Sequence, residues 1–118
     1  MQHRILLIEN SITAESRMYR ALSELGQVMR ARSMLEATAQ CAQLHPDMVV
    51  ADCPVDGMAC SSVAQYLKAN DCDAALVALT YPDRDTSDRG NFAVLRKPVR
   101  DPDLLATARR ILNSRGEA

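Results

Sequence analysis

Five polar residues with complementary chemistry follow short apolar runs of this sequence. Glu9 and Asn10 come directly after the first run, and Asp52 directly after a later one. Thr80 follows a third run, and Lys97 lies two positions after a fourth. Together they offer carboxylate and amide oxygens, a hydroxyl group and a compact positive charge. Convergent polar groups of this kind are typical of ligand sites.

Each of these residues also has a plainer interpretation. A carboxylate at the end of a strand, such as Asp52, is more often a helix cap or a solvated turn residue. Lys97 is more informative, because only it and Lys68 are lysines among 14 basic residues. An ammonium supplies a single point charge that a planar guanidinium does not mimic. The set as a whole favours function, provided that the fold brings its members together.

The apolar runs have the pattern of strands in a parallel sheet. Residues 5–8, 48–51 and 75–79 are apolar throughout, which is typical of strands covered on both faces. Residues 27–32 mix apolar and charged side chains and suit an edge strand. Residues 92–95 form the last predicted strand.

Segments with a helical period separate these runs. They predict helices over about 13–25, over 34–44, around 63–67 and from 101 onward. Ser33 and Glu36 have capping-box spacing, in which each side chain bonds the main-chain amide of the other. Residues 81–90 have almost no apolar face, so we expect a loop or a single turn there.

Alternating strands and helices predict right-handed crossovers and helices on both sides of the sheet. We therefore expect an α/β, flavodoxin-like, doubly wound parallel sheet of five strands in the order 2-1-3-4-5, with the fourth helix shortened or missing. In such a sheet all strands end at one edge, where ligands bind. The 118 residues fit a single domain, and we expect the tail at 113–118 to be a frayed end or the start of a linker.

Composition excludes several classes of function. A net charge of −1 argues against direct nucleic-acid binding and against attraction to an anionic membrane. No apolar run approaches the length of a membrane span, so we expect a cytoplasmic protein. The four cysteines form no C-x-x-C pair, and we expect reduced, packed thiols.

The motifs resemble those of receiver domains in bacterial two-component response regulators, along nearly the whole chain. The matching segments are ILLIEN at 5–10, HPDMVVAD at 45–52, ALT at 78–80 and LRKP at 95–98. The resemblance implies a signalling module rather than an enzyme. In it, Asp52 accepts a phosphoryl group from a histidine kinase, a histidine phosphotransfer protein or a small donor such as acetyl phosphate.

The resemblance also implies roles for the other residues. Mg²⁺ would take oxygen ligands from Asp52, from Glu9 through water, from the position of Asn10 and from the Pro54 carbonyl. Lys97 and Thr80 would bind the phosphoryl oxygens. The signal would reach an output domain or partner protein through residues 81–95 and the last helix.

Arg109 and Arg110 on that last helix could also meet a partner or a second copy of the chain. A solvated helix face is their default interpretation.

Three departures from the family pattern leave two hypotheses open. Asn10 stands where the family usually has a carboxylate ligand, and a unit charge pair at 4 Å is worth about 4 kcal/mol at an effective dielectric of 20. We therefore expect weak Mg²⁺ binding. The loop after Asp52 reaches its Asp-Gly step early, and Val94 replaces a switching aromatic residue. The chain is either an atypical phosphorylated receiver or a phosphorylation-independent pseudo-receiver that acts as an interaction module.

Overall fold

The computed structural model of the chain describes residues 3–9, 15–81 and 92–116. The strands are β1 (His3–Ile8), β2 (Gly26–Ala31), β3 (Met48–Asp52), β4 (Ala75–Thr80) and β5 (Phe92–Arg96). The helices are α1 (Glu15–Ser23), α2 (Met34–Leu44), α3 (Cys60–Ala69) and α4 (Asp101–Gly116).

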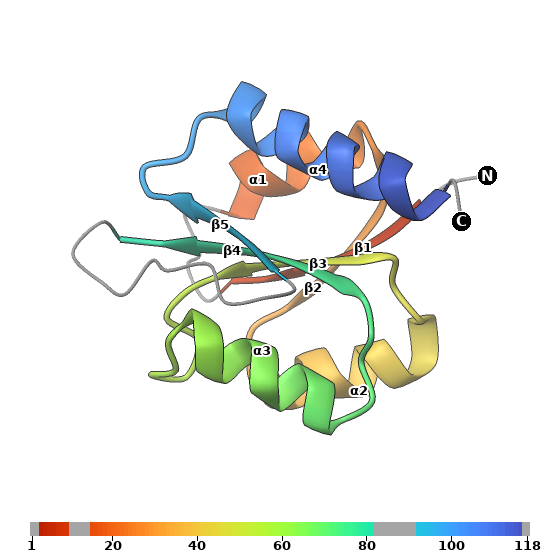
Figure 1. Cartoon of the computed structure of the whole chain (residues 1–118), viewed down its shortest axis with the longest axis vertical. Coiled ribbons are helices and arrows are strands. Elements are labelled where there is room, and N and C mark those ends of the chain that lie inside the picture. The colour runs from red at the N-terminus through yellow and green to blue at the C-terminus, as the bar shows by residue number, and fades with distance from the viewer. Residues whose placement is uncertain (1–2, 10–14, 82–91, 117–118) are drawn as a thin grey trace.

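The strands form one parallel sheet in the order β2-β1-β3-β4-β5. Helices α1 and α4 cover one face of it, and α2 and α3 cover the other (Figure 1). The predicted flavodoxin-like doubly wound sheet and its strand order are therefore confirmed. The edge positions of β2 and β5 agree with their mixed and partial burial.

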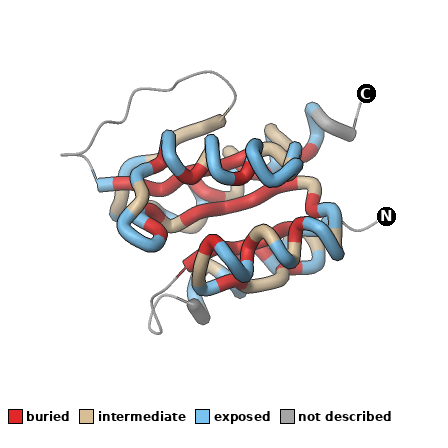
Figure 2. The backbone as a smooth tube through the Cα atoms, turned by 90° about the horizontal axis from the view of Figure 1, so that it is seen from below, coloured by how far each residue is buried: buried red, intermediate tan, exposed pale blue. Residues whose placement is uncertain are grey.

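Two apolar cores lie on the two faces of the sheet, because successive side chains of a strand point to opposite sides. On β1, Leu6 and Ile8 pack into the core under α2 and α3. Ile5 and Leu7 pack into the core under α1 and α4. The central strands are buried along most of their length (Figure 2). This two-sided burial explains why the runs for β1, β3 and β4 are apolar without alternation.

The start of α2 agrees with the predicted cap in one half only. The Glu36 amide donates to Ser33 Oγ at 3.1 Å, as expected. The Glu36 carboxylate, however, accepts from the Arg32 amide at 3.1 Å rather than from the Ser33 amide. A second carboxylate closes the helix end, because Asp56 accepts from the Met34 amide at 2.8 Å. The predicted bounds of 34–44 are confirmed.

The C-terminal helix is longer than the sequence predicts. α4 begins at Asp101 as expected and continues through Gly116, into the tail at 113–118 that was expected to be a frayed end or the start of a linker. None of the helices in the described residues combines the length and apolar character that a bilayer span requires. The sequence predicts a loop or a single turn instead of a full helix over 81–90. All of this segment except Tyr81 lies outside the described residues.

Gly26 opens β2 at a point where two main chains approach closely. A Cβ atom at this position would lie 2.3 Å from the His3 carbonyl oxygen. We expect Gly26→Ala to lower the free energy of unfolding by about 1–3 kcal/mol, because main-chain atoms must move to remove the overlap. Thermal unfolding followed by circular dichroism measures this loss.

Gly57→Ala is the control for the Gly26 substitution. Gly57 has a φ of +78°, and no atom would lie within 4 Å of an added Cβ. Its replacement has only the cost of the left-handed conformation, about 1 kcal/mol. A loss below about 1 kcal/mol for Gly26→Ala would show that the close approach to His3 is not what requires glycine.

Candidate functional site

The centre of the site is a direct contact between Lys97 and Asp52. Lys97 Nζ donates to Asp52 Oδ1 at 2.7 Å and to the Cys53 carbonyl oxygen at 2.7 Å. Both charged side chains are only 17% exposed. Two opposite charges that water reaches so little attract each other more strongly than those of a surface salt bridge. The contact joins residues 45 positions apart in the chain.

The sheet explains how these two residues meet. Asp52 is the last residue of β3, and Lys97 directly follows β5, with β4 between the two strands. Main-chain bonds continue past the strand ends, because the Lys97 amide donates to Thr80 at 2.7 Å and the Cys53 amide to Leu79 at 2.8 Å. The lysine side chain therefore reaches across the end of β4 to the carboxylate.

Thr80 is held beside this pair by its main chain. It is the last residue of β4, is 4% exposed, and its carbonyl accepts the Lys97 amide. The sequence placed Thr80 at the same edge as Lys97, and the structure agrees on that position.

Glu9 lies at the end of the strand next to Asp52. Ile8 pairs with Ala51, so Glu9 and Asp52 are the next residues along two adjacent parallel strands. Glu9 is 1% exposed, and its amide donates to Ala31 at 3.0 Å. The structure thus gathers Glu9, Asp52, Thr80 and Lys97 at one edge of the sheet. Asn10 falls outside the described residues.

Tyr81 is a member of the site that sequence reasoning missed. Its ring centroid lies 4.1 Å from Lys97 Nζ, which is within the range of a cation–π interaction. The ring is half exposed, at 51% for the residue. Its place directly after Thr80 was the available signal, but the Pro82 that follows made it look like part of a polar loop.

A cavity of about 540 Å³ opens beside the pair. Asp52, Lys97 and Tyr81 line it, together with Arg17 and Asp101 from the two helices on this face. Arg17 Nε and Asp101 Oδ1 are 3.2 Å apart, but both side chains are well exposed, so this ion pair stabilises little. The cavity leaves room for a small ligand next to the Asp52 carboxylate.

The donors that this edge would offer a metal ion are hard oxygens. Glu9 and Asp52 would supply carboxylates, and Pro54, exposed two residues after Asp52, would supply a carbonyl. Such oxygens are the ligands that Mg²⁺ prefers. Within the described residues, no three His, Cys, Asp or Glu side chains group closely enough to hold a metal ion. The donor set therefore fits Mg²⁺ in kind but offers few negative charges.

Cys53 lies next to Asp52, but we expect its thiol to be unreactive. Burial is the main cause that raises the pKa of its thiol, and Cys60 and Asp52 raise this pKa further. Lys97 lowers it by less than the others raise it. Because the thiolate is the reactive form, we expect Cys53 to resist iodoacetamide up to pH 9 in the folded protein. Peptide mass mapping measures this, and unfolding in guanidinium should expose it. Rapid labelling of folded protein would contradict the burial of Cys53.

No family model matches the chain, and no curated protein matches it either. Solved structures, in contrast, are similar in fold. A response regulator receiver domain protein from Clostridium thermocellum has a TM-score of 0.83 at 22% identity, over 97% of both chains.

The receiver domain of a signal transduction histidine kinase from Syntrophus aciditrophicus has a TM-score of 0.79 at 24% identity, over 95% of this chain and 91% of that one. The chemotaxis response regulator CheY4 of Vibrio cholerae has a TM-score of 0.77 at 20% identity, over 94% and 99%. The chain thus has the fold of response-regulator receiver domains.

Proposed function

We propose that the chain is a phosphorylatable receiver domain of the response-regulator type and that Asp52 is its phosphoacceptor. The observation that carries the proposal is the bond from Lys97 Nζ to Asp52 Oδ1, formed beside an open cavity at the carboxyl edge of the sheet. Ligands bind at this edge in doubly wound folds.

The residues of the site suit attack by a carboxylate on phosphorus. An Asp52 oxygen forms the new P–O bond, and the bond from phosphorus to the donor's imidazole nitrogen, or to the acetate oxygen of acetyl phosphate, breaks. The Lys97 ammonium, which bonds the Asp52 carboxylate at rest, can turn to the incoming phosphoryl oxygens and stabilise their negative charge. Thr80 can offer its hydroxyl to the same oxygens from the end of β4.

Mg²⁺ would be held by Asp52, by Glu9 through water and by the Pro54 carbonyl. When bound, it would neutralise charge on the phosphoryl oxygens. Glu9 and Asp52 would keep two negative charges at the edge, and Lys97 offsets one of them. With Asn10 in place of a third carboxylate, binding should be weak.

The partners follow from this chemistry. The donor is a phosphohistidine on a histidine kinase or a histidine phosphotransfer protein. The receiving surface for an output domain or partner protein is the face of β5 and α4, where a cavity of about 370 Å³ lies between Arg96, Pro98 and Thr107. The negative charge of an added phosphoryl group would draw the Lys97 ammonium away from Asp52. The main chain that joins β5 to α4, at the beginning of this face, would move with it.

A phosphorylation-independent interaction module is the second candidate function. It is favoured by Val94, which is half-buried on β5 and stands where the family has an aromatic residue for switching. In this case the β5 and α4 face would bind its partner in one state only.

Acetyl phosphate with millimolar Mg²⁺ distinguishes the two functions. We expect the intact mass of the protein to rise by one phosphoryl group, and beryllofluoride to shift the amide NMR signals of Thr80 and Lys97. Asp52→Asn should abolish the mass increase, since it removes the attacking oxygen.

Asp103→Asn is the matched control, because Asp103 is an exposed aspartate on α4. It should accept the phosphoryl group as the unmodified protein does. No mass increase in the unmodified protein at millimolar Mg²⁺ would reject phosphorylation and leave the interaction module. The same mass increase in Asp52→Asn would assign the acceptor elsewhere.

A further inference from the structure

Two cysteines far from the Asp52 site lie almost within bonding distance. Cys41 Sγ and Cys72 Sγ are 2.7 Å apart, although the residues are 31 positions apart in the chain. A disulfide bond measures about 2.05 Å, so a shift of roughly 0.7 Å would close it. Both residues are thiols in the structure.

The backbone holds both sulfur atoms in place. Cys41 lies in α2, where it is 5% exposed and belongs to the core under α2 and α3. Cys72 lies in the loop between α3 and β4, where its amide donates to the Leu67 carbonyl at 2.9 Å. The preceding residue, Asp71, has a φ of +62° and donates its amide to Lys68. The loop is therefore ordered around Cys72.

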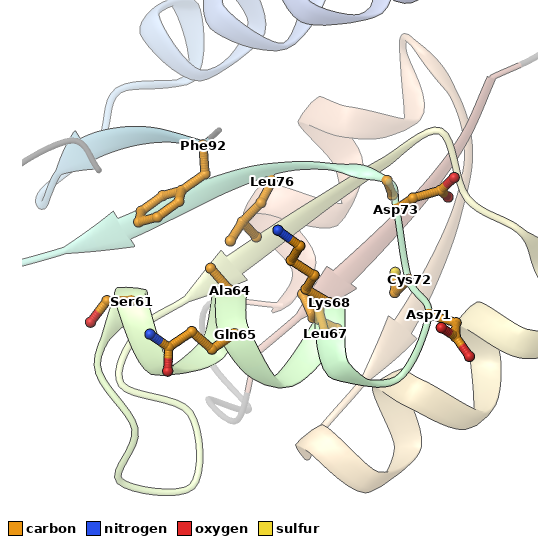
Figure 3. Close-up of a pocket in the computed structure, with 11 residues that line it drawn as sticks. Ser61, Ala64, Gln65, Leu67, Lys68, Asp71, Cys72, Asp73, Leu76 and Phe92 are labelled. Carbon is orange, nitrogen blue, oxygen red and sulfur yellow. The ribbon is translucent and has the colours of Figure 1, made fainter. Parts of the chain in front are cut away.

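A cavity gives small molecules access to one member of the pair. Cys72 lies in the wall of a cavity of about 820 Å³ beside α3, between Asp71 and Asp73 (Figure 3). Cys72 is partly exposed, whereas Cys41 is buried behind it. A small oxidant would therefore meet Cys72 first.

The environment also divides the roles of the two thiols. The hydrogen bond from Cys41 lowers the pKa of Cys72 to about 7, with help from the Ala74 main chain and against burial and the charge of Asp73. The same hydrogen bond and burial raise the pKa of Cys41. Cys72 is thus the thiol that ionises near neutral pH and can act as the nucleophile.

We propose that Cys41 and Cys72 form a reversible dithiol–disulfide pair that a peroxide oxidises. The Cys72 thiolate attacks one oxygen of hydrogen peroxide, the O–O bond breaks, and hydroxide leaves and is protonated to water. Cys72 is then a sulfenic acid.

The Cys41 sulfur closes the pair in a second step. It attacks the Cys72 sulfur, the S–O bond breaks, and the departing hydroxide takes the Cys41 proton. Two thiols and one peroxide thus give one disulfide and two waters, and a small dithiol reverses the change. The pair lies at the opposite edge of the sheet from Asp52, because Cys72 precedes β4 and Asp52 ends β3.

Stoichiometric hydrogen peroxide added to the reduced full chain tests the pair. We expect the intact mass to fall by two hydrogen atoms and non-reducing peptide mapping to find Cys41 joined to Cys72. The melting temperature should rise by on the order of 10 °C, because the bond closes a loop of 31 positions. Dithiothreitol should restore the original mass and melting temperature.

Variants check the order of the two steps. Cys41→Ala should leave a sulfenic acid on Cys72 that dimedone captures, while Cys60→Ala, the matched control, should form the disulfide as before. Cys72→Ser, at a partly exposed position, should form none. Alkylation of Cys72 should be about tenfold faster at pH 8 than at pH 6, because the thiolate fraction rises through its pKa.

Three outcomes would overturn the proposal. They are four free thiols after peroxide treatment, a disulfide that joins Cys53 to Cys60, or oxidation of Cys72 to a sulfinic acid while Cys41 stays reduced. None of these results depends on whether Asp52 is phosphorylated.

Discussion

Lys97→Met is expected to slow the phosphorylation of Asp52 by about two to three orders of magnitude. Methionine keeps most of the side-chain length, but it removes the ammonium that bonds Asp52 at 2.7 Å and lies over the Tyr81 ring. The charge that would develop on the phosphoryl oxygens then has no ammonium at position 97 to meet it. The initial rate of mass increase with acetyl phosphate at fixed Mg²⁺ measures the loss.

Lys68→Met is the matched control, because Lys68 is the other lysine of the chain and is exposed on α3. Its phosphorylation rate should equal that of the unmodified protein. Amide NMR spectra of both variants establish that they are folded. A Lys97→Met protein that is folded and phosphorylated at the normal rate would remove the catalytic role of the ammonium.

Leu7→Ala is expected to lower the free energy of unfolding by about 2–5 kcal/mol. Leu7 is 0% exposed and lies in the core between the sheet and helices α1 and α4. The lost methine and methyl groups leave a cavity that the rigid central strands cannot close. A domain of this size loses roughly 4 °C of melting temperature per kcal/mol, so a fall of about 8–20 °C is expected by calorimetry.

Leu35→Ala removes the same atoms from an exposed position. Leu35 lies in the first turn of α2 and is 75% exposed, so its truncation should change stability by less than about 0.5 kcal/mol. Similar losses for the two leucines would contradict the burial that separates them.

The strands were predictable because their apolar runs are a direct consequence of two-sided burial. Residues 48–51 and 75–79 have no polar face, and both lie in the centre of the sheet. The helix over 34–44 was equally accessible, because Ser33 marks its start with a side chain that bonds the Glu36 amide. The length of α4 was not, because the polar residues from Asn113 onward give no apolar stripe.

The sequence indicated which edge of the sheet holds Glu9, Asp52, Thr80 and Lys97, but not how their side chains are arranged. Because Asp52 and Thr80 each end a predicted strand, the sequence places both at one edge of a parallel sheet. It does not show which side chains are in contact there. Contact depends on β4 lying between β3 and β5 and on the main-chain bond from Lys97 to Thr80. Tyr81 was missed for the same reason, since its contact with Lys97 is a matter of side-chain placement.

By itself, the sequence determined the flavodoxin-like class, the strand order and the edge where the polar residues gather. These properties follow from periodicity and from the rules of parallel sheets, which act along the chain. Only the tertiary structure decided that Lys97 bonds Asp52 and that Cys41 lies 2.7 Å from Cys72. Both pairs join residues more than 30 positions apart, and a contact of that kind is set by how the elements pack rather than by any local pattern.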